Sequence, residues 1–203
     1  MPTGPKLSVM KKKETQVLQE RIALFNDEVA FKQLFKHYYT ALLRFAIAIT
    51  KEKEPAEEIV GDQFVNIWNK RSSITNISNL KLYLYIAVRN RCLNFIRRNG
   101  NIYTITPEQT GTAFHDVTPD PENIMIASEL LQAVNKAILE LPPKCREVYT
   151  LVKEDGLSYK EVAELLNISP RTVENHIATA VRKLAASLNI DLSSYRRSSI
   201  LPS

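Results

Sequence analysis

Apolar residues recur at steps of three and four through most of the chain, which is the period of an amphipathic helix. Such series run through residues 55–71, 79–98, 122–141 and 144–153, and no alternating pattern of strand length interrupts them. The longest series begins near Asp27, and its apolar members are Phe31, Leu34, Phe35, Tyr38, Leu42, Phe45 and Ile49. The sequence therefore predicts an all-α protein.

One stretch without an apolar period divides the helical pattern. Residues 101–121 are rich in Gly, Pro, Thr and Asp, a composition typical of a linker. We therefore expect two small helical domains, residues 24–100 and 122–188, on either side of a flexible linker. Residues 1–23 and 189–203 are expected to be flexible tails.

The second domain contains the signals of two short helices joined by a tight turn. Ser158 and Glu161 have the spacing of a capping box at the start of the first helix. Asn167 tolerates the left-handed conformation that commonly ends a helix. Ser169 can cap the next helix, and Pro170 suits its first position. These signals predict a helix-turn-helix.

The second helix of this pair, residues 170–184, has two different faces when its residues are placed at about 100° per residue. One face is apolar and consists of Val173, Ile177, Ala180 and Leu184. The opposite face and its flank carry the candidate DNA-binding residues Arg171, Thr172, Asn175, Ala178, Thr179, Arg182 and Lys183. Arg can pair with guanine, Asn with adenine, and Ala or Thr can meet a thymine methyl group. The pattern predicts a recognition helix in the major groove of duplex DNA; the alternative is a helical hairpin with a solvated polar face.

The first domain contains a long run without acidic residues. From Gln63 to Pro107 there is no Asp or Glu, whereas Lys and Arg are interleaved with aromatic residues. Basic side chains can follow phosphates and aromatic rings can stack on unpaired bases, which together predict contact with single-stranded nucleic acid. The alternative is that some of these aromatic residues form the core. The residues concerned are Lys70, Arg71, Lys81, Arg89, Arg91, Arg97 and Arg98, with Trp68, Tyr83, Tyr85, Phe95 and Tyr103.

Composition supports the same class of partner. The net charge is +5 and the isoelectric point is about 9.1, which permits nucleic acid as a partner without requiring it. Cys92 and Cys145 are too few for a disulfide framework, so we expect a reducing cytoplasm. The chain has no signal-peptide pattern and no apolar run long enough to span a membrane.

The sequence offers little support for catalytic or metal chemistry. Glu58 and Asp62 lie one helical turn apart and could share a metal ion, but no further acid follows until Glu108. No Ser or Cys sits in a nucleophile motif. We therefore expect no enzyme activity, metal, cofactor or small-molecule substrate. No metal-ligand spacing is found among the histidines, which are His37, His115 and His176.

Three sequence blocks together resemble the extracytoplasmic-function sigma factors of the sigma-70 superfamily. The blocks are AEEIVGDQFVNIW, YLYIAVRNRCLNFIRR and LPPKCREVYTLVKEDGLSYKEVAELLNISPRTVENHIATAVRKL. The resemblance covers about residues 25–98 and 122–188. Gly61 departs from it, because the family usually has Gln at this position. The rival interpretation is a helix-turn-helix regulator that acts without polymerase, but it leaves the acid-free first domain unexplained.

The resemblance implies a subunit that binds core RNA polymerase, recognises the −35 and −10 promoter elements, helps to open the −10 region and initiates transcription of a specific regulon. The first domain would be region 2, and its expected contacts with the polymerase clamp are Glu58, Asp62, Phe64, Val65 and Trp68. The same domain would bind the −10 strand through Arg71, Ser73, Asn76, Lys81, Tyr85, Arg89, Asn90, Arg97 and Arg98. The second domain would be region 4 and would read the −35 duplex. The family also implies a partner anti-sigma factor, which is often anchored in the membrane.

Overall fold

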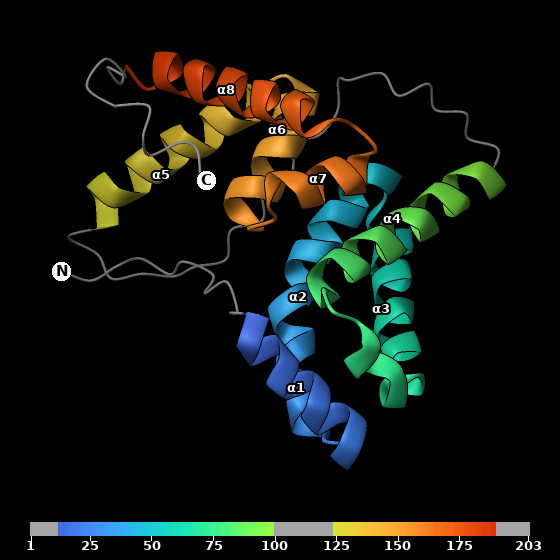
Figure 1. Cartoon of the computed structure of the whole chain (residues 1–203). Coiled ribbons are helices and arrows are strands. Elements are labelled where there is room, and N and C mark those ends of the chain that lie inside the picture. The colour runs from blue at the N-terminus through green and yellow to red at the C-terminus, as the bar shows by residue number, and fades with distance from the viewer. Residues whose placement is uncertain (1–11, 100–123, 190–203) are drawn as a thin grey trace. The chain divides into compact units, whose positions relative to one another are not determined.

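A computed structural model describes residues 12–99 and 124–189, which form two helical units (Figure 1). The first unit contains α1 (Lys12–Phe25), α2 (Glu28–Thr50), α3 (Lys53–Asn69), the 3-10 helix η1 (Arg71–Asn76) and α4 (Leu80–Arg98). The second contains α5 (Ile124–Leu139), α6 (Pro143–Tyr149), the π-helix η2 (Thr150–Glu154), α7 (Tyr159–Leu166) and α8 (Pro170–Ser187). No strand occurs in these described ranges, and the all-α prediction with two helical domains is confirmed.

The predicted linker, residues 101–121, lies outside the described part of the chain, and so does the predicted C-terminal tail beyond Asn189. None of the helices in the described ranges is long and apolar enough to cross a membrane.

The first unit is built around the apolar face of α2. Asp27 caps this helix, because its Oδ1 accepts a hydrogen bond of 2.9 Å from the backbone N–H of Ala30. The helix ends at Lys51, whose left-handed conformation directs its N–H to the Ile47 carbonyl. α3 and α4 pack against α2. The buried apolar residues of α2, α3 and α4 are Ala30, Leu34, Tyr38, Leu42, Phe45, Ala46, Ala56, Val60, Phe64, Ile67, Leu80, Leu82, Leu84, Tyr85, Val88 and Cys92.

Helix α1 corrects the predicted N-terminal tail. Residues 12–23 were expected to be flexible, but they belong to a helix that packs on α2 and η1. Leu18 and Ile22 are buried, and the polar side chains of Thr15 and Gln19 are buried beside them. The apolar period is short because half of the inner face is polar. A pattern that counts only apolar residues therefore does not detect this helix.

The segment between α3 and α4 forms a 3-10 helix. Ile74 is buried and fixes η1 to the unit, whereas Ser72, Ser73, Thr75 and Asn76 are exposed. Asn79 caps the following helix, α4, because its Oδ1 accepts a hydrogen bond of 3.2 Å from the Leu82 N–H.

In the second unit, α5 and α6 pack against the C-terminal half of α8. Their shared core is Ala137, Leu141, Cys145, Ala180 and Leu184, with Ile138, Tyr149 and Leu188 packed around it. The helix predicted over residues 144–153 changes from α to π winding at Thr150. π winding pairs residue i with i+5 rather than i+4, and over a five-residue segment the apolar period does not distinguish the two.

Candidate nucleic-acid and polymerase interfaces

The caps predicted for the helix-turn-helix are present in the structure. The Ser158 N–H donates to Glu161 Oε2 at 2.6 Å, and the Glu161 N–H donates to Ser158 Oγ at 3.3 Å. Asn167 ends α7 in the left-handed region, with φ 55° and ψ 50°. Ser169 then caps α8 by accepting a hydrogen bond of 3.0 Å from the Thr172 N–H. These local interactions fix where each helix begins and ends.

The two faces predicted for α8 are also present. Its apolar face is buried and consists of Val173, Ile177, Ala180, Leu184 and Ala185. Of the predicted DNA-binding residues, Thr172 and Thr179 are half-buried on the flank, and the exposed ones are Arg171, Asn175, Ala178, Arg182 and Lys183. A buried apolar face holds the helix in the unit while the polar face remains available to a ligand. This is the arrangement that major-groove recognition requires.

Arg171 forms an ion pair with Glu174, whose Oε2 lies 2.7 Å from the arginine Nη1. Both residues lie on α8, one turn apart. An exposed pair of this kind contributes only about 0.2–1 kcal/mol, so a stronger partner can replace Glu174 at little cost. A guanine edge or a DNA phosphate would be such a partner for the guanidinium.

His176 lies on the flank of α8 that faces α6. Its Nδ1 is 3.5 Å from the Sγ of Cys145, and burial raises the pKa of that thiol. The contact shows that this histidine packs against a neighbouring helix. Within the described residues, no group of three or more His, Cys, Asp or Glu side chains could hold a metal ion.

In the first unit, the predicted single-strand contacts on α4 divide by exposure. Asn90, Arg97 and Arg98 are exposed, and Arg97 donates a hydrogen bond of 2.7 Å to the Asn94 side chain. Lys81 and Arg89 are half-buried. The exposed basic side chains therefore gather at the C-terminal end of α4, on a helix without any acidic residue.

The structure contradicts the prediction that Tyr85 contacts the −10 strand. Its side chain is only 1% exposed, and its ring packs against Phe45 of α2 with 5.1 Å between the centroids. Burial also raises the pKa of its hydroxyl. A ring enclosed in this way cannot stack on a base. Tyr83, two residues earlier on α4, is 37% exposed and is the more accessible of the two rings.

The short helix η1 presents polar groups beside a small hollow. Ser73 and Asn76 are exposed as the prediction requires, and Ser73 Oγ donates to the Lys70 carbonyl at 2.9 Å. The hollow is lined by Asn66, Ile67, Lys70, Ser73, Ile74, Ile77 and Tyr83. Hydroxyl, amide and aromatic groups thus meet on one surface, which suits contact with an unpaired base.

Arg71 is engaged within the unit. Its Nε donates to the side chain of Asn26, and its Nη1 donates to the Trp68 carbonyl at 3.0 Å. The guanidinium also lies over the Trp68 ring, 4.9 Å from the centroid. These contacts assign Arg71 a structural role at the start of η1, in addition to any contact with DNA.

An apolar groove runs between α2 and α3, and it contains three of the predicted polymerase contacts. The groove is lined by Glu28, Phe31, Phe35, Gly61, Phe64, Val65 and Trp68. Val65 is 57% exposed. Trp68 is half-buried, and its ring lies 5.0 Å from that of Phe31. Both side chains can therefore meet a partner.

Phe64 does not fit its predicted role as a direct contact. It is 2% exposed, and its ring lies 4.8 Å from that of Phe35 and 6.4 Å from that of Phe31. The side chain forms the floor of the groove and belongs to the core. Sequence position alone did not separate Phe64 from its exposed neighbour Val65, because both lie in the same block of the family resemblance.

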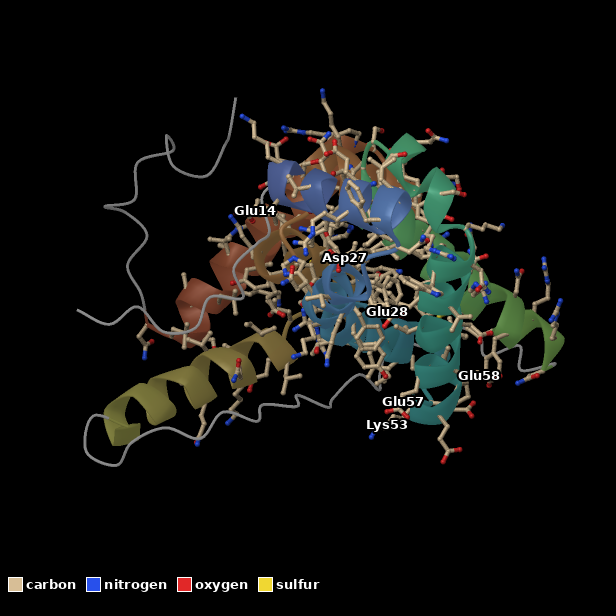
Figure 2. The ribbon with its side chains drawn as sticks, turned by 90° about the horizontal axis from the view of Figure 1, so that it is seen from below. Glu14, Asp27, Glu28, Lys53, Glu57 and Glu58 are labelled. Carbon is tan, nitrogen blue, oxygen red and sulfur yellow. The ribbon has the colours of Figure 1, made fainter. Side chains whose placement is uncertain are left out.

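The acidic residues predicted to bind the polymerase lie on the exposed side of α3. Figure 2 shows Glu57 and Glu58 near the start of this helix, where Lys53 pairs with Glu57 at 3.5 Å. One turn beyond Glu58, the carboxylate of Asp62 is 3.5 Å from Arg91 of α4. The side chains of this second pair are 62% and 39% exposed, so water screens the interaction strongly. Asp62 can therefore exchange Arg91 for a cation on a partner.

Gly61 provides a test of how the groove is used. A Cβ at this position would meet no atom within 4 Å. Because Gly inside a helix costs about 0.5–1 kcal/mol relative to Ala, we expect Gly61→Ala to stabilise the first unit. The thermal midpoint should rise by about 2–8 °C. Unfolding can be monitored by the fluorescence of Trp68, the single tryptophan of the chain.

A lower midpoint in Gly61→Ala would show that the backbone at this position needs glycine. If core polymerase also binds this variant less tightly, the added methyl group occupies space that the partner uses.

Both units match regions of one protein family. Residues 34–102 match Sigma-70 region 2, and residues 131–184 match Sigma-70, region 4. Together the two matches cover more than half of the chain, in the order region 2 and then region 4.

Individual relatives agree with this assignment. The ECF RNA polymerase sigma factor SigM of Bacillus subtilis (strain 168) is 26% identical over 157 residues, which are 77% of this chain and 94% of the relative. The ECF RNA polymerase sigma-E factor of Escherichia coli (strain K12) is 28% identical over 173 residues, covering 81% and 89% of the two chains. Among solved structures, the sigma factor RpoE from Bartonella quintana, in complex with the anti-sigma factor NepR, is similar with a TM-score of 0.53. It is 26% identical, and the match covers 79% of this chain and 98% of that one.

The family matches and the relatives lead to one conclusion. The chain belongs to the extracytoplasmic-function branch of the sigma-70 family, and it is a sigma factor that initiates transcription with RNA polymerase.

Proposed function

We propose that the two units divide promoter recognition between them. The second unit, α5 to α8, reads the −35 duplex, whereas the first, α1 to α4, binds core polymerase and captures the −10 strand. The observation that carries this proposal is the contrast between α8 and α3. α8 exposes Arg171 and Asn175 for DNA, whereas α3 exposes the acids Glu58 and Asp62, which would repel DNA and suit a basic protein surface.

The −35 contact is supported by the orientation of α8. Its buried face fixes the rotation of the helix, so the exposed residues form one continuous strip. Arg171 and Asn175 are one turn apart near its N-terminal end, the part of a recognition helix that meets base edges. Arg182 and Lys183 lie further along the helix and are suited to phosphates.

The −10 contact is supported by η1 and α4. Ser73 offers a hydroxyl group and Tyr83 an aromatic surface at the hollow beside η1, and Asn76 is exposed on the same short helix. Arg97 and Arg98 provide positive charge further along α4. We propose that the unpaired bases lie against η1 and that the basic end of α4 follows the phosphates.

We further propose that an anti-sigma factor controls this protein. The protein itself would act in the cytoplasm with RNA polymerase. The relative from Bartonella quintana is in complex with an anti-sigma factor, which supports a partner of this class. The exposed apolar groove between α2 and α3 is a surface that such a partner could cover.

Charge reversal at Asp62 tests the proposed polymerase contact. We expect Asp62→Arg to weaken binding to bacterial core polymerase by at least tenfold, because it removes an attraction and adds a repulsion to a basic surface. Binding of the −35 duplex should not change. Affinity for core can be measured by fluorescence anisotropy of the labelled protein.

Glu20→Arg on α1 is the matched control, since it makes the same charge change at another exposed position of the first unit. Equal losses of affinity in both variants would show that the effect comes from net charge and not from the position of Asp62. Unchanged affinity in Asp62→Arg would place the clamp contact elsewhere on the unit.

A further inference from the structure

Helix α1 begins well before the region 2 match, which starts at residue 34, yet it holds the segment that we assign to the −10 strand. Gln19 lies on its inner face and is only 3% exposed. The side-chain amide donates a hydrogen bond of 2.7 Å to the carbonyl of Ile74 and one of 3.0 Å to the carbonyl of Ile77. One side chain thus ties two points at the end of η1 to α1.

The start of η1 is held by the turn that follows α1. Asn26 adopts the left-handed conformation, with φ 52°, and its side chain accepts a hydrogen bond from Arg71, the first residue of η1. The same guanidinium binds the Trp68 carbonyl and covers the Trp68 ring. Both ends of η1 are therefore anchored, and its exposed polar side chains lie between the anchors.

A short 3-10 helix needs such anchors. Its hydrogen bonds have poor geometry, so the segment has little stability of its own. At the C-terminal end of η1, the N–H of Ile77 donates to the Ile74 carbonyl at 3.1 Å, and Gln19 donates to that same carbonyl. An amide is suited to this position because its two N–H groups can reach two carbonyl oxygens at once.

We propose that Gln19 is a positioning residue for −10 recognition, whose amide holds η1 in the conformation that presents Ser73 and Asn76 to the unpaired strand. The inference rests on the proposed role of η1. A segment that is already ordered loses less conformational entropy on binding, and its polar groups stay in one arrangement. Gln19 therefore contributes both affinity and base preference without touching DNA.

The test compares Gln19→Met with Gln16→Met in the full chain assembled with core polymerase. Methionine keeps the length of the side chain and removes both donors. Gln16 is exposed on the same helix and is the matched control. The probe is a pool of single-stranded oligonucleotides that carry a short randomised tract, and the bound fraction is sequenced.

We expect Gln19→Met to bind the preferred oligonucleotides about tenfold more weakly, equivalent to about 1.4 kcal/mol, and to discriminate less between them. Backbone amides of residues 72–77 should exchange hydrogen faster. Binding to core polymerase and to −35 duplex should be unchanged, and Gln16→Met should behave as the wild type. Base preferences are ratios within one sample, so a loss of folded protein would not imitate this result.

Asn76→Ala separates failure of this inference from failure of the proposed function. If Asn76→Ala alters base preference and Gln19→Met does not, the positioning role is overturned and η1 remains the reading segment. If neither substitution alters base preference, η1 does not read the −10 strand, and both the proposed role of η1 and the positioning role of Gln19 are wrong.

Discussion

Replacing Arg171 and Asn175 together by alanine should strongly reduce selective binding to the −35 element while leaving affinity for core polymerase unchanged. Each side chain is exposed on the outer face of α8, and neither contributes to the buried face that holds the helix. A good pairing with a base edge contributes about 1–3 kcal/mol of discrimination. Loss of both should reduce the preference for the cognate duplex by about a hundredfold or more.

The measurement is a competition between cognate −35 duplex and a scrambled duplex at fixed salt. Fixed salt is needed because phosphate contacts depend strongly on ionic strength. Lys136→Ala on α5 is the control, since it removes one exposed positive charge from a different helix of the same unit. If the double variant keeps the discrimination of the wild type, the reading face does not include these residues.

Phe64→Ala should destabilise the first unit strongly. The ring is almost fully enclosed between α2 and α3 and contacts Phe31 and Phe35. Truncation of a buried Phe to Ala usually costs about 3–5 kcal/mol, because apolar contacts are lost and a cavity remains. For a unit of this size, the thermal midpoint should fall by about 15 °C or more. Trp68 lies on the same helix, so its fluorescence reports the unfolding of this unit alone.

Val65→Glu is the matched comparison for Phe64→Ala, because the next side chain of α3 is exposed. We expect its thermal midpoint to stay close to that of the wild type and its affinity for core polymerase to fall about tenfold, since an exposed substitution changes stability by only about 0.5 kcal/mol. If Phe64→Ala unfolds at the wild-type temperature, the ring is not a core residue. If Val65→Glu binds core as the wild type does, the groove is not part of the polymerase contact.

The sequence was most informative where the signals are local. The caps at Ser158 and Ser169, the left-handed Asn167 and the two faces of α8 each depend on residues within one or two helical turns. Such signals act through hydrogen bonds to the adjacent backbone, so they can be recognised without knowledge of the tertiary fold. The structure confirms all of these local features, and the base contacts of α8 remain a prediction.

The errors arose where tertiary packing determines the role of a residue. Tyr83 and Tyr85 are two residues apart on α4, so their side chains point in different directions. Composition does not reveal this difference, and both tyrosines were grouped with the aromatic residues of the acid-free stretch. Only the packing of α4 on α2 shows that Tyr85 is enclosed by Phe45. Gln19 is the converse case, because a polar residue is expected at the surface until its carbonyl partners are known. Those partners are more than fifty residues away along the chain.

The most direct test of the central claim is run-off transcription with the purified protein, bacterial core polymerase and a pool of genomic fragments from the source organism. We predict transcripts that start at discrete positions only when the protein is added, and that disappear with the Arg171→Ala, Asn175→Ala double variant. Absence of transcripts together with absence of core binding, while DNA binding is retained, would contradict the assignment and leave a regulator that acts without polymerase.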